Sequence, residues 1–309
     1  MPYTTGSAAD MDAVKTALVN ACTSDGWTEQ TDDDFKTVLS KNGMYVRVEA
    51  FSDIGDGYPG FTLLGRTALN SGDAPGVVSM RSLGGRYSNT ESIIFPVTYH
   101  IFTFTAEVYF LINWSNIYQW CAFGQSSQSG LPGIGNWVTA TIGEEDPELG
   151  VQIKAAEGGY RSGQDFTATS AAFFWTTAYG GTPARNAWLY NDFEASYPWA
   201  LGNGSNSSGP VGIRYLTELI NTQPNSFNAE SVLMPIRAYK VRPNSKISQI
   251  LEVTNARHIR IDNYNVEQII TLGTDDWMVF PYYKKDISNR DGGDTINHTG
   301  TFGWAIKKE

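Results

Sequence analysis

Residues 97–123 constrain the fold more strongly than any other part of this 309-residue chain. Apolar and polar side chains alternate along this segment at a period of two. The apolar set is Phe102, Phe104, Ala106, Val108, Phe110 and Ile112, and the polar set is His100, Thr103, Thr105 and Glu107. Successive side chains of a strand point to opposite faces, so this pattern predicts a strand with one apolar face. Trp114-Ser115-Asn116 predicts a turn, after which residues 117–123 return alongside. We therefore expect a central antiparallel hairpin.

Strand-like runs also dominate the two ends of the chain. They cover residues 35–39, 44–50, 61–64, 233–241, 247–253, 258–261, 268–272, 277–282 and 302–307. Asn42-Gly43 lies between the first two runs and predicts a tight hairpin, because both residues tolerate a positive φ. The 31 glycines and 13 prolines fit an architecture with many turns. The predicted fold class is mainly β (α+β), with antiparallel sheets in a sandwich-like body.

One amphipathic helix is predicted near the start of the chain. Its apolar positions follow helical spacing: Met11, Val14, Leu18, Ala21 and Cys22. Ser7 and Asp10 have the spacing of a capping box, which predicts a helix that begins directly after Ser7. Gly26 predicts its end. We expect this helix to pack on a small sheet built from the first sixty-five residues.

The pattern of composition predicts two parts. Residues 1–92 form an N-terminal α+β part, and residues 93–309 form a β-rich body with aromatic, Gly/Ser/Asn-rich insertions at about 125–230. Residues 70–92 are expected to be loop. Residues 213–220 fit either a short helix or a strand, and both alternatives stay open.

Charge and hydropathy narrow the classes of partner. The formal net charge is −10 and the isoelectric point is near 4.8, so nucleic acid and anionic membranes are poor partners. The chain has no run of about eighteen apolar residues, and Asp10 and Asp12 interrupt any signal-peptide pattern. We expect no membrane insertion. Cys22 and Cys121 are too few for a disulfide scaffold or a zinc ribbon, and we expect both to be small buried hydrophobes.

No motif for catalysis or cofactor binding stands out. Phosphate-binding glycine motifs and a zinc-binding H-E-x-x-H are missing from the sequence, and its three histidines lie far apart. His100 is expected to be structural. Three acidic clusters have oxygen ligands that suit calcium: Asp32-Asp33-Asp34, Asp53 with Asp56, and Asp291 with Asp294. Turn chemistry explains them more simply. We expect no catalytic residue, no metal site and no cofactor, and hence no enzyme.

Aromatic residues in the middle of the chain are the better functional lead. Six of them lie in Gly-, Asn- and Ser-rich segments: Trp175, Tyr179, Trp188, Tyr190, Tyr197 and Trp199. Tyrosine and tryptophan are enriched in interfaces and also stack on sugar rings. These six residues are the predicted interaction surface, with core packing as the alternative. The acidic residues Glu144, Glu145 and Asp146 leave a polysaccharide hydrolase as a weaker hypothesis.

Short motifs near both ends carry a family resemblance. They are Tyr3-Thr-Thr-Gly6, Gly26-Trp27, Trp277-Met-Val-Phe280 and Phe302-Gly-Trp-Ala-Ile306. Together with the helix and the 99–123 double strand, their order along the chain resembles an uncharacterised family of tailed-bacteriophage virion structural proteins encoded among the tail genes.

This resemblance implies a role in the virion. The expected function is that of a structural component of the tail, collar or baseplate, which assembles with copies of itself and with other virion proteins, with fibre anchoring as one form of that role. The chain would be made in the host bacterial cytoplasm and end in the virion. The alternative is a module at the tail tip that binds a receptor or a host surface glycan.

Overall fold

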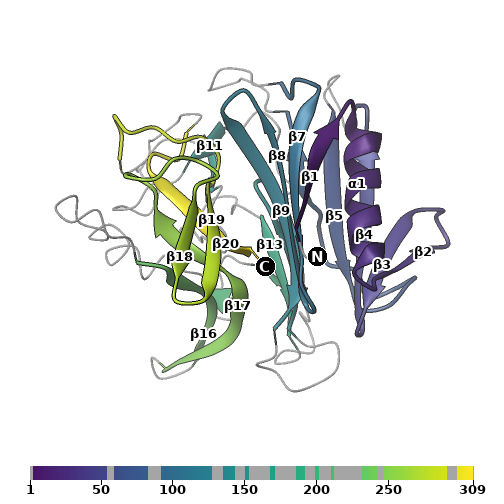
Figure 1. Cartoon of the computed structure of the whole chain (residues 1–309). Helices are drawn as coiled ribbons and strands as arrows, with labels where there is room; N and C mark the ends of the chain where they lie inside the picture. Colours follow the sequence, from purple (N-terminus) through teal and green to yellow (C-terminus); the bar gives the residue numbers. More distant parts are fainter. Residues whose placement is uncertain are drawn as a thin grey trace, which may run out of the picture.

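The computed structural model describes residues 3–53, 59–82, 92–126, 135–142, 150–152, 168–170, 186–191, 199–201, 210–211, 232–242, 246–290 and 298–308. Within these residues the chain forms three antiparallel sheets stacked as layers, with one helix at the side (Figure 1). A short parallel pair, β11 (Gly150–Gln152) and β12 (Ala168–Ser170), stands apart from them. The predicted mainly β fold with an N-terminal helix is confirmed.

The central sheet has seven strands in the order β1-β7-β8-β9-β10-β13-β14. Their bounds are β1 Tyr3–Ala8, β7 Val97–Thr103, β8 Glu107–Trp114, β9 Ile117–Gln125, β10 Asn136–Ala140, β13 Ala187–Tyr190 and β14 Trp199–Leu201. The predicted central hairpin is confirmed, because β8 and β9 pair through Trp114 and Ile117 around a two-residue turn. Ser115 takes a φ of +56° in this turn.

The expectation that only one face of this hairpin is apolar is wrong. Every residue of β8 except Asn113 is buried, and every residue of β9 except Gln125 is buried. Phe110 packs against Phe61 of one neighbouring sheet, and Trp120 packs against Trp304 of the other. A sheet covered on both faces needs apolar side chains in both registers, so a period-two reading misses half of the core.

The second layer, called here the helix-side sheet, has five strands in the order β2-β3-β4-β5-β6. Their bounds are β2 Thr28–Thr31, β3 Thr37–Lys41, β4 Met44–Phe51, β5 Gly60–Arg66 and β6 Val78–Arg81. Asn42 and Gly43 turn the chain between β3 and β4 with φ values of +53° and +83°, which confirms the predicted hairpin. β6 lies within residues 70–92, so the prediction of loop there is wrong in part.

The third layer, called here the C-terminal sheet, has six strands in the order β15-β16-β17-β20-β19-β18. Their bounds are β15 Pro210–Val211, β16 Met234–Arg242, β17 Lys246–Arg260, β18 Ile269–Leu272, β19 Asp275–Pro281 and β20 Phe302–Lys308. β17 is one long strand where the sequence predicts two. Its pairing with β16 shifts register between Pro235 and Arg237 and again between Ala238 and Tyr239. Such irregularities bend a strand and let one long strand follow the twist of the layer.

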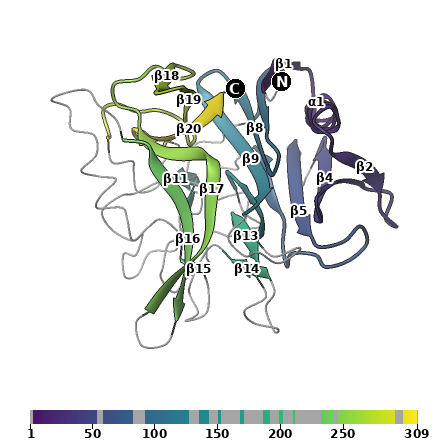
Figure 2. The same cartoon turned by 60° about the horizontal axis from the view of Figure 1, so that its bottom comes forward.

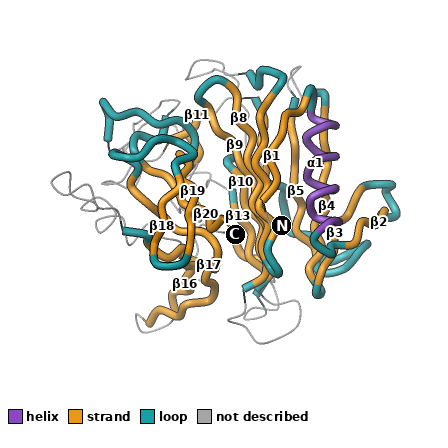
Figure 3. Tube along the Cα trace, viewed as in Figure 1, coloured by secondary structure: helices purple, strands orange, loops and turns teal. Residues whose placement is uncertain are grey.

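Helix α1 (Met11–Ser24) packs on β1 and β7 of the central sheet and on β2, β4 and β5 of the helix-side sheet (Figure 3). The prediction that Ser7 caps it is wrong. Ser7 belongs to β1, where it pairs with Thr98, and Asp10 is the true N-cap, with its carboxylate accepting from the Ala13 N–H at 2.7 Å. No helix in the described part of the chain is long and apolar enough to cross a membrane.

The predicted N-terminal part and the predicted body contribute strands to the same central sheet and side chains to the same hydrophobic core. β1 pairs with β7 along its whole length, from Tyr3 opposite Phe102 to Ala8 opposite Val97. One hydrophobic cluster contains residues of α1 and of all three sheets. β10, β13 and β14 of the central sheet come from the predicted insertion region, while residues 143–149 and 212–231 lie outside the described residues.

A buried carboxylate ties the central sheet to the C-terminal sheet. Glu107, at the start of β8, is 1% exposed. It accepts hydrogen bonds from the backbone N–H groups of Thr254 and Asn255, at 2.7 and 2.8 Å, and from the Asn255 side chain at 2.8 Å. The Tyr109 hydroxyl donates a fourth bond at 2.7 Å. These bonds fix β17 against β8 at Thr254 and Asn255, two residues that are paired with neither β16 nor β20.

Candidate interaction site

The loop between β2 and β3 presents the most exposed large apolar side chain in the described part of the chain. Phe35 is 89% exposed, although it lies between strands of a well-packed protein. The β2–β3 tip, defined here as residues 32–36, sits at the outer edge of the helix-side sheet. The prediction that residue 35 begins a strand is wrong, since β3 starts at Thr37.

The backbone of the tip is that of a three-residue hairpin loop. The Asp32 N–H donates to the Lys36 carbonyl and the Phe35 N–H donates to the Asp32 carbonyl, both at 3.0 Å. Phe35 has a φ of +60°, in the left-handed region. The third loop residue of such hairpins takes this conformation and is usually glycine. A phenylalanine there is strained by about 1–2 kcal/mol.

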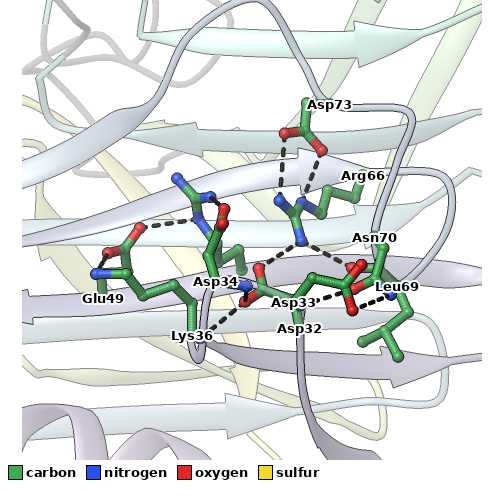
Figure 4. Close-up of polar contacts among 10 residues, drawn as sticks. Asp32, Asp33, Asp34, Lys36, Glu49, Arg66, Leu69, Asn70 and Asp73 are labelled. Carbon is green, nitrogen blue, oxygen red and sulfur yellow. Dashed lines mark hydrogen bonds and ion pairs between the residues drawn. The ribbon is translucent and has the colours of Figure 1, made fainter.

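Asp32 fastens the tip to the sheet (Figure 4). One carboxylate oxygen accepts from the backbone N–H groups of Asp34 at 3.1 Å and Lys36 at 2.8 Å. The other oxygen lies 2.7 Å from the Arg66 guanidinium of β5, and both side chains are at most 5% exposed. Arg66 also donates to the Leu69 carbonyl and pairs with Asp73, each at 2.7 Å. The tip is therefore tied to two other segments through one guanidinium.

A second clasp lies beside the first. The Asp33 N–H donates to the Asn70 side chain at 3.1 Å, and the Asn70 amide donates back to the Asp33 carboxylate at 3.0 Å. On the other side, Lys36 pairs with Glu49 at 2.7 Å (Figure 4). Every residue flanking Phe35 within the tip is thus held by a polar contact, whereas the phenyl ring faces solvent.

The pKa of Asp32 reflects this anchoring. Burial by itself raises the pKa of a carboxyl group. The hydrogen bond from the Lys36 N–H and the hydrogen bond and charge of Arg66 outweigh it, so the pKa of Asp32 lies below its usual value. The anchor is therefore ionised at neutral pH. Its stabilisation is lost as the pH falls through that lowered pKa.

Phe35→Gly is expected to raise the free energy of unfolding by about 0.5–1 kcal/mol, because the relief of left-handed strain exceeds the added entropy of the unfolded chain. Urea denaturation of the full chain would measure this. The control is Ile287→Gly, which removes another exposed apolar side chain (71%) at a residue without a positive φ and should not stabilise. A loss of more than about 1 kcal/mol in Phe35→Gly would mean that the ring packs on the protein.

The acidic clusters have separate outcomes. Asp32 is occupied by an arginine and two backbone donors, which supports the interpretation of its run as turn chemistry. Asp56, Asp291 and Asp294, like Glu144, Glu145 and Asp146, lie outside the described residues. Within the described ranges no group of three or more His, Cys, Asp or Glu residues is arranged to hold a metal ion.

The six aromatic residues of the predicted interaction surface fall into two groups. Trp188 of β13 and Trp199 of β14 are each 4% exposed, and Tyr190 is half-buried. The Trp199 indole donates to the Gly72 carbonyl at 2.9 Å and packs edge-on against Tyr190, with ring centroids 5.2 Å apart. Both tryptophans are core residues in this chain. Trp175, Tyr179 and Tyr197 lie outside the described residues.

His100 belongs to a polar group between the central and C-terminal sheets. Its Nδ1 lies 2.9 Å from the Tyr3 hydroxyl, and its Nε2 lies 3.3 Å from a Glu267 carboxylate oxygen. The Tyr118 hydroxyl donates to the same oxygen at 2.7 Å, and the Phe280 ring packs edge-on against the imidazole, with ring centroids 5.3 Å apart. Glu267 takes a φ of +64° to reach this position. The hydrogen bond from His100 is the main cause that lowers the pKa of Glu267.

Glu267→Gln is expected to cost about 1 kcal/mol at pH 7, a modest value because the carboxylate is 40% exposed. A carboxyl group with a lowered pKa stabilises the fold above its unfolded pKa, near 4.5, and loses this contribution as the pH falls through the folded pKa. Wild type and variant should therefore converge in acid. Urea titrations from pH 7 to pH 3 test this, with exposed Glu29→Gln as control. A difference independent of pH would contradict the ionic account.

Three further titratable groups, His258, Cys22 and Cys121, are buried. His258 is buried and contacts the Tyr282 hydroxyl, and burial lowers the pKa of this imidazole to about 3. Cys22 and Cys121 are both free and buried, which confirms the expectation for them. Burial raises the pKa of both thiols, so neither is poised as a thiolate nucleophile.

The sequence predicts the turn of the β2–β3 tip, but it predicts neither the exposure of Phe35 nor the contact with Arg66. Asp32-Asp33-Asp34 marks a turn, yet Phe35 reads as the start of a strand because aromatics favour strands. Arg66, the partner that fixes the tip, is 34 positions away, and no local pattern links them. No protein-family model matches the chain, and no curated protein matches its sequence.

Proposed function

We propose that the chain is a structural component of a tailed-bacteriophage virion, in the tail, collar or baseplate region, and that it acts by assembly. The observation that carries the assembly role is the rigid presentation of Phe35 to solvent at the β2–β3 tip. An exposed aromatic on a fixed support suits protein–protein contact, because little side-chain or loop entropy remains to be lost on binding. The resemblance of the chain ends to phage tail-gene products supports the virion as the setting.

The architecture suits such a role. The three layers share one hydrophobic cluster, and the buried Glu107 carboxylate ties the central sheet to the C-terminal sheet, so the surface features of the body keep fixed relative positions. β18 forms one end of the C-terminal sheet, and its Ile269 and Leu272 are 43% and 47% exposed. An edge strand with exposed apolar side chains supports pairing with a further strand, including one from another copy. Homo-oligomer formation is part of the proposal on this ground.

The alternative of a glycan-binding module at a tail tip has weaker support. Of the aromatic residues that motivate it, the two described tryptophans are buried in the central sheet. We therefore rank assembly first.

Mass spectrometry of density-purified particles from the phage that encodes the chain tests the proposal. We expect the chain at a fixed copy number per particle, and image reconstruction should locate it in the tail or neck. The control is a non-structural protein of the same phage, which should be lost on purification. Absence of the chain from infectious particles would refute the virion role.

A further inference from the structure

We infer that the β2–β3 tip inserts Phe35 into an apolar socket, bordered by lysine or arginine side chains, on a protein other than a second copy of this chain. This inference deepens the proposed function and rests on it for the setting, but the contact itself is argued from the tip. In two views of the molecule, β2 lies at the periphery, away from the central sheet (Figures 1 and 2).

The shape of the tip is that of a single anchor. Phe35 is 89% exposed, and its neighbours Asp33 and Asp34 are exposed too. Thr28, Glu29 and Thr31 of β2 are also exposed and continue this surface along one strand. An aromatic ring that fills a pocket, surrounded by polar contacts that exclude water, is the usual arrangement of an interface hot spot.

The tip keeps this ring outward at a cost to the isolated chain. Its φ of +60° is strained for phenylalanine, and its exposure leaves apolar surface in water. Strained residues persist where the surroundings over-determine them, and here the Asp32–Arg66 and Asp33–Asn70 contacts do so. The conformation of Phe35 is unfavourable in the unbound chain, yet the surrounding contacts hold it firmly. A bound state in which a partner buries the ring explains both facts.

The charge of the tip selects the partner. Asp32 is paired with Arg66, and Lys36, whose side chain is 43% exposed, is paired with Glu49. The exposed charges beside the ring that these two ion pairs do not neutralise are Asp33 and Asp34. The side chain of Asp34 is 73% exposed, and its carboxylate lies 4.0 Å from the Arg47 guanidinium. Two carboxylates at the rim favour a socket bordered by positive charge. A second copy, with a formal net charge of −10, repels such a rim on average.

Photocrosslinking in infected cells tests the contact. The full chain carries p-benzoylphenylalanine in place of Phe35 or, as the matched control, in place of Ile287, which is also exposed (71%) but lies after β19. We expect position 35 to crosslink to a different protein, at an apolar pocket that contains lysine or arginine, and position 287 not to. Adducts only with another copy, or none at position 35, would overturn the inference.

Affinity for the crosslinked protein, purified, gives the second measurement. Phe35→Ala should weaken binding about 30-fold, the size of a hot spot, whereas Ile287→Ala should change it less than about 3-fold. Asp34→Lys should weaken binding and reduce its dependence on salt. Circular dichroism melts show that each variant is folded. Equal affinity of wild type and Phe35→Ala would overturn the inference.

The two proposals fail separately. If the chain is in virions but position 35 gives no adduct, the virion role stands and the tip inference falls. If position 35 crosslinks to a basic-rimmed pocket on a protein that is absent from virions, the tip inference stands and the virion role falls.

Discussion

Arg66→Met lowers the free energy of unfolding by about 4 kcal/mol, because it leaves the buried Asp32 carboxylate without its cation. Methionine keeps much of the side-chain volume, so the loss reports the charge and its hydrogen bonds rather than a cavity. The Leu69 carbonyl and Asp73 lose their donor as well. Denaturant titration monitored by tryptophan fluorescence measures the change.

A double-mutant cycle separates the pair from its surroundings. Asp32→Asn keeps an acceptor for the Asp34 and Lys36 N–H groups, and the double variant should be less destabilised than the sum of the single variants by about 2–3 kcal/mol. The matched control is the more exposed pair Arg237–Glu252 on the C-terminal sheet, where Arg237→Met should cost at most about 1 kcal/mol. Similar losses at both sites would contradict the buried-pair account.

The tip itself should respond to the same substitution. Without Arg66 the tip loses the Asp32–Arg66 contact and keeps only the Asp33–Asn70 contact. Phe35 is then less ordered in the unbound chain, and the entropy cost of ordering it falls on binding. Affinity of Arg66→Met for the crosslinked partner should fall while the variant is still folded, at a temperature well below its melting point. A variant that is destabilised but binds normally would show that the tip does not depend on this anchor.

Glu107→Ala is the second large effect, with an expected loss of about 4 kcal/mol. The substitution leaves the N–H groups of Thr254 and Asn255 and the hydroxyl of the fully buried Tyr109 without their acceptor, and a buried unsatisfied group costs about 1–3 kcal/mol. Glu107→Gln keeps the shape and one carbonyl oxygen, and should cost roughly half as much. Thermal and urea denaturation of both variants measure these losses.

The location of the damage distinguishes this clamp from a general loss of stability. Hydrogen exchange in Glu107→Ala should rise first at residues 254–258 of β17, where that strand meets the central sheet, and not in the β3–β4 hairpin of the helix-side sheet. Exposed Glu29→Ala is the matched control and should change neither stability nor exchange. Uniform exchange over all three sheets would mean that the clamp has no local role.

Local patterns in the sequence were sufficient to predict several elements of the fold. Asn42-Gly43 predicts its hairpin because a tight two-residue turn requires a positive φ at both positions. This requirement is local and does not depend on the rest of the fold. Met44, Val46 and Val48 predict the buried face of β4 because this strand is fully covered on one side only. The helix face that contains Val14 and Leu18 is likewise set by one-sided burial.

Features that depend on a partner far away in the sequence could not be predicted from local patterns. Whether Glu107 is a solvated strand residue or a buried clamp depends on Thr254 and Asn255, about 150 positions later. The helix begins at Met11, after its cap Asp10, and not directly after Ser7, because Ser7 pairs with Thr98 of β7 in the central sheet. The candidate site combines both cases, since its turn is local but its rigidity comes from Arg66.

The pairing of β1 with β7 also sets an order of events during synthesis. Tyr3 and His100 meet across 97 positions, so at about 5–20 residues per second β1 waits roughly 5–20 s for its partner to leave the ribosome. During this interval α1 and the helix-side strands can associate, but the face that they turn to the central sheet has no cover. The opposite face of the central sheet waits longer still, until Phe280 and Trp304 are made. Slower elongation or lower temperature should therefore change the yield of this chain more than its final stability.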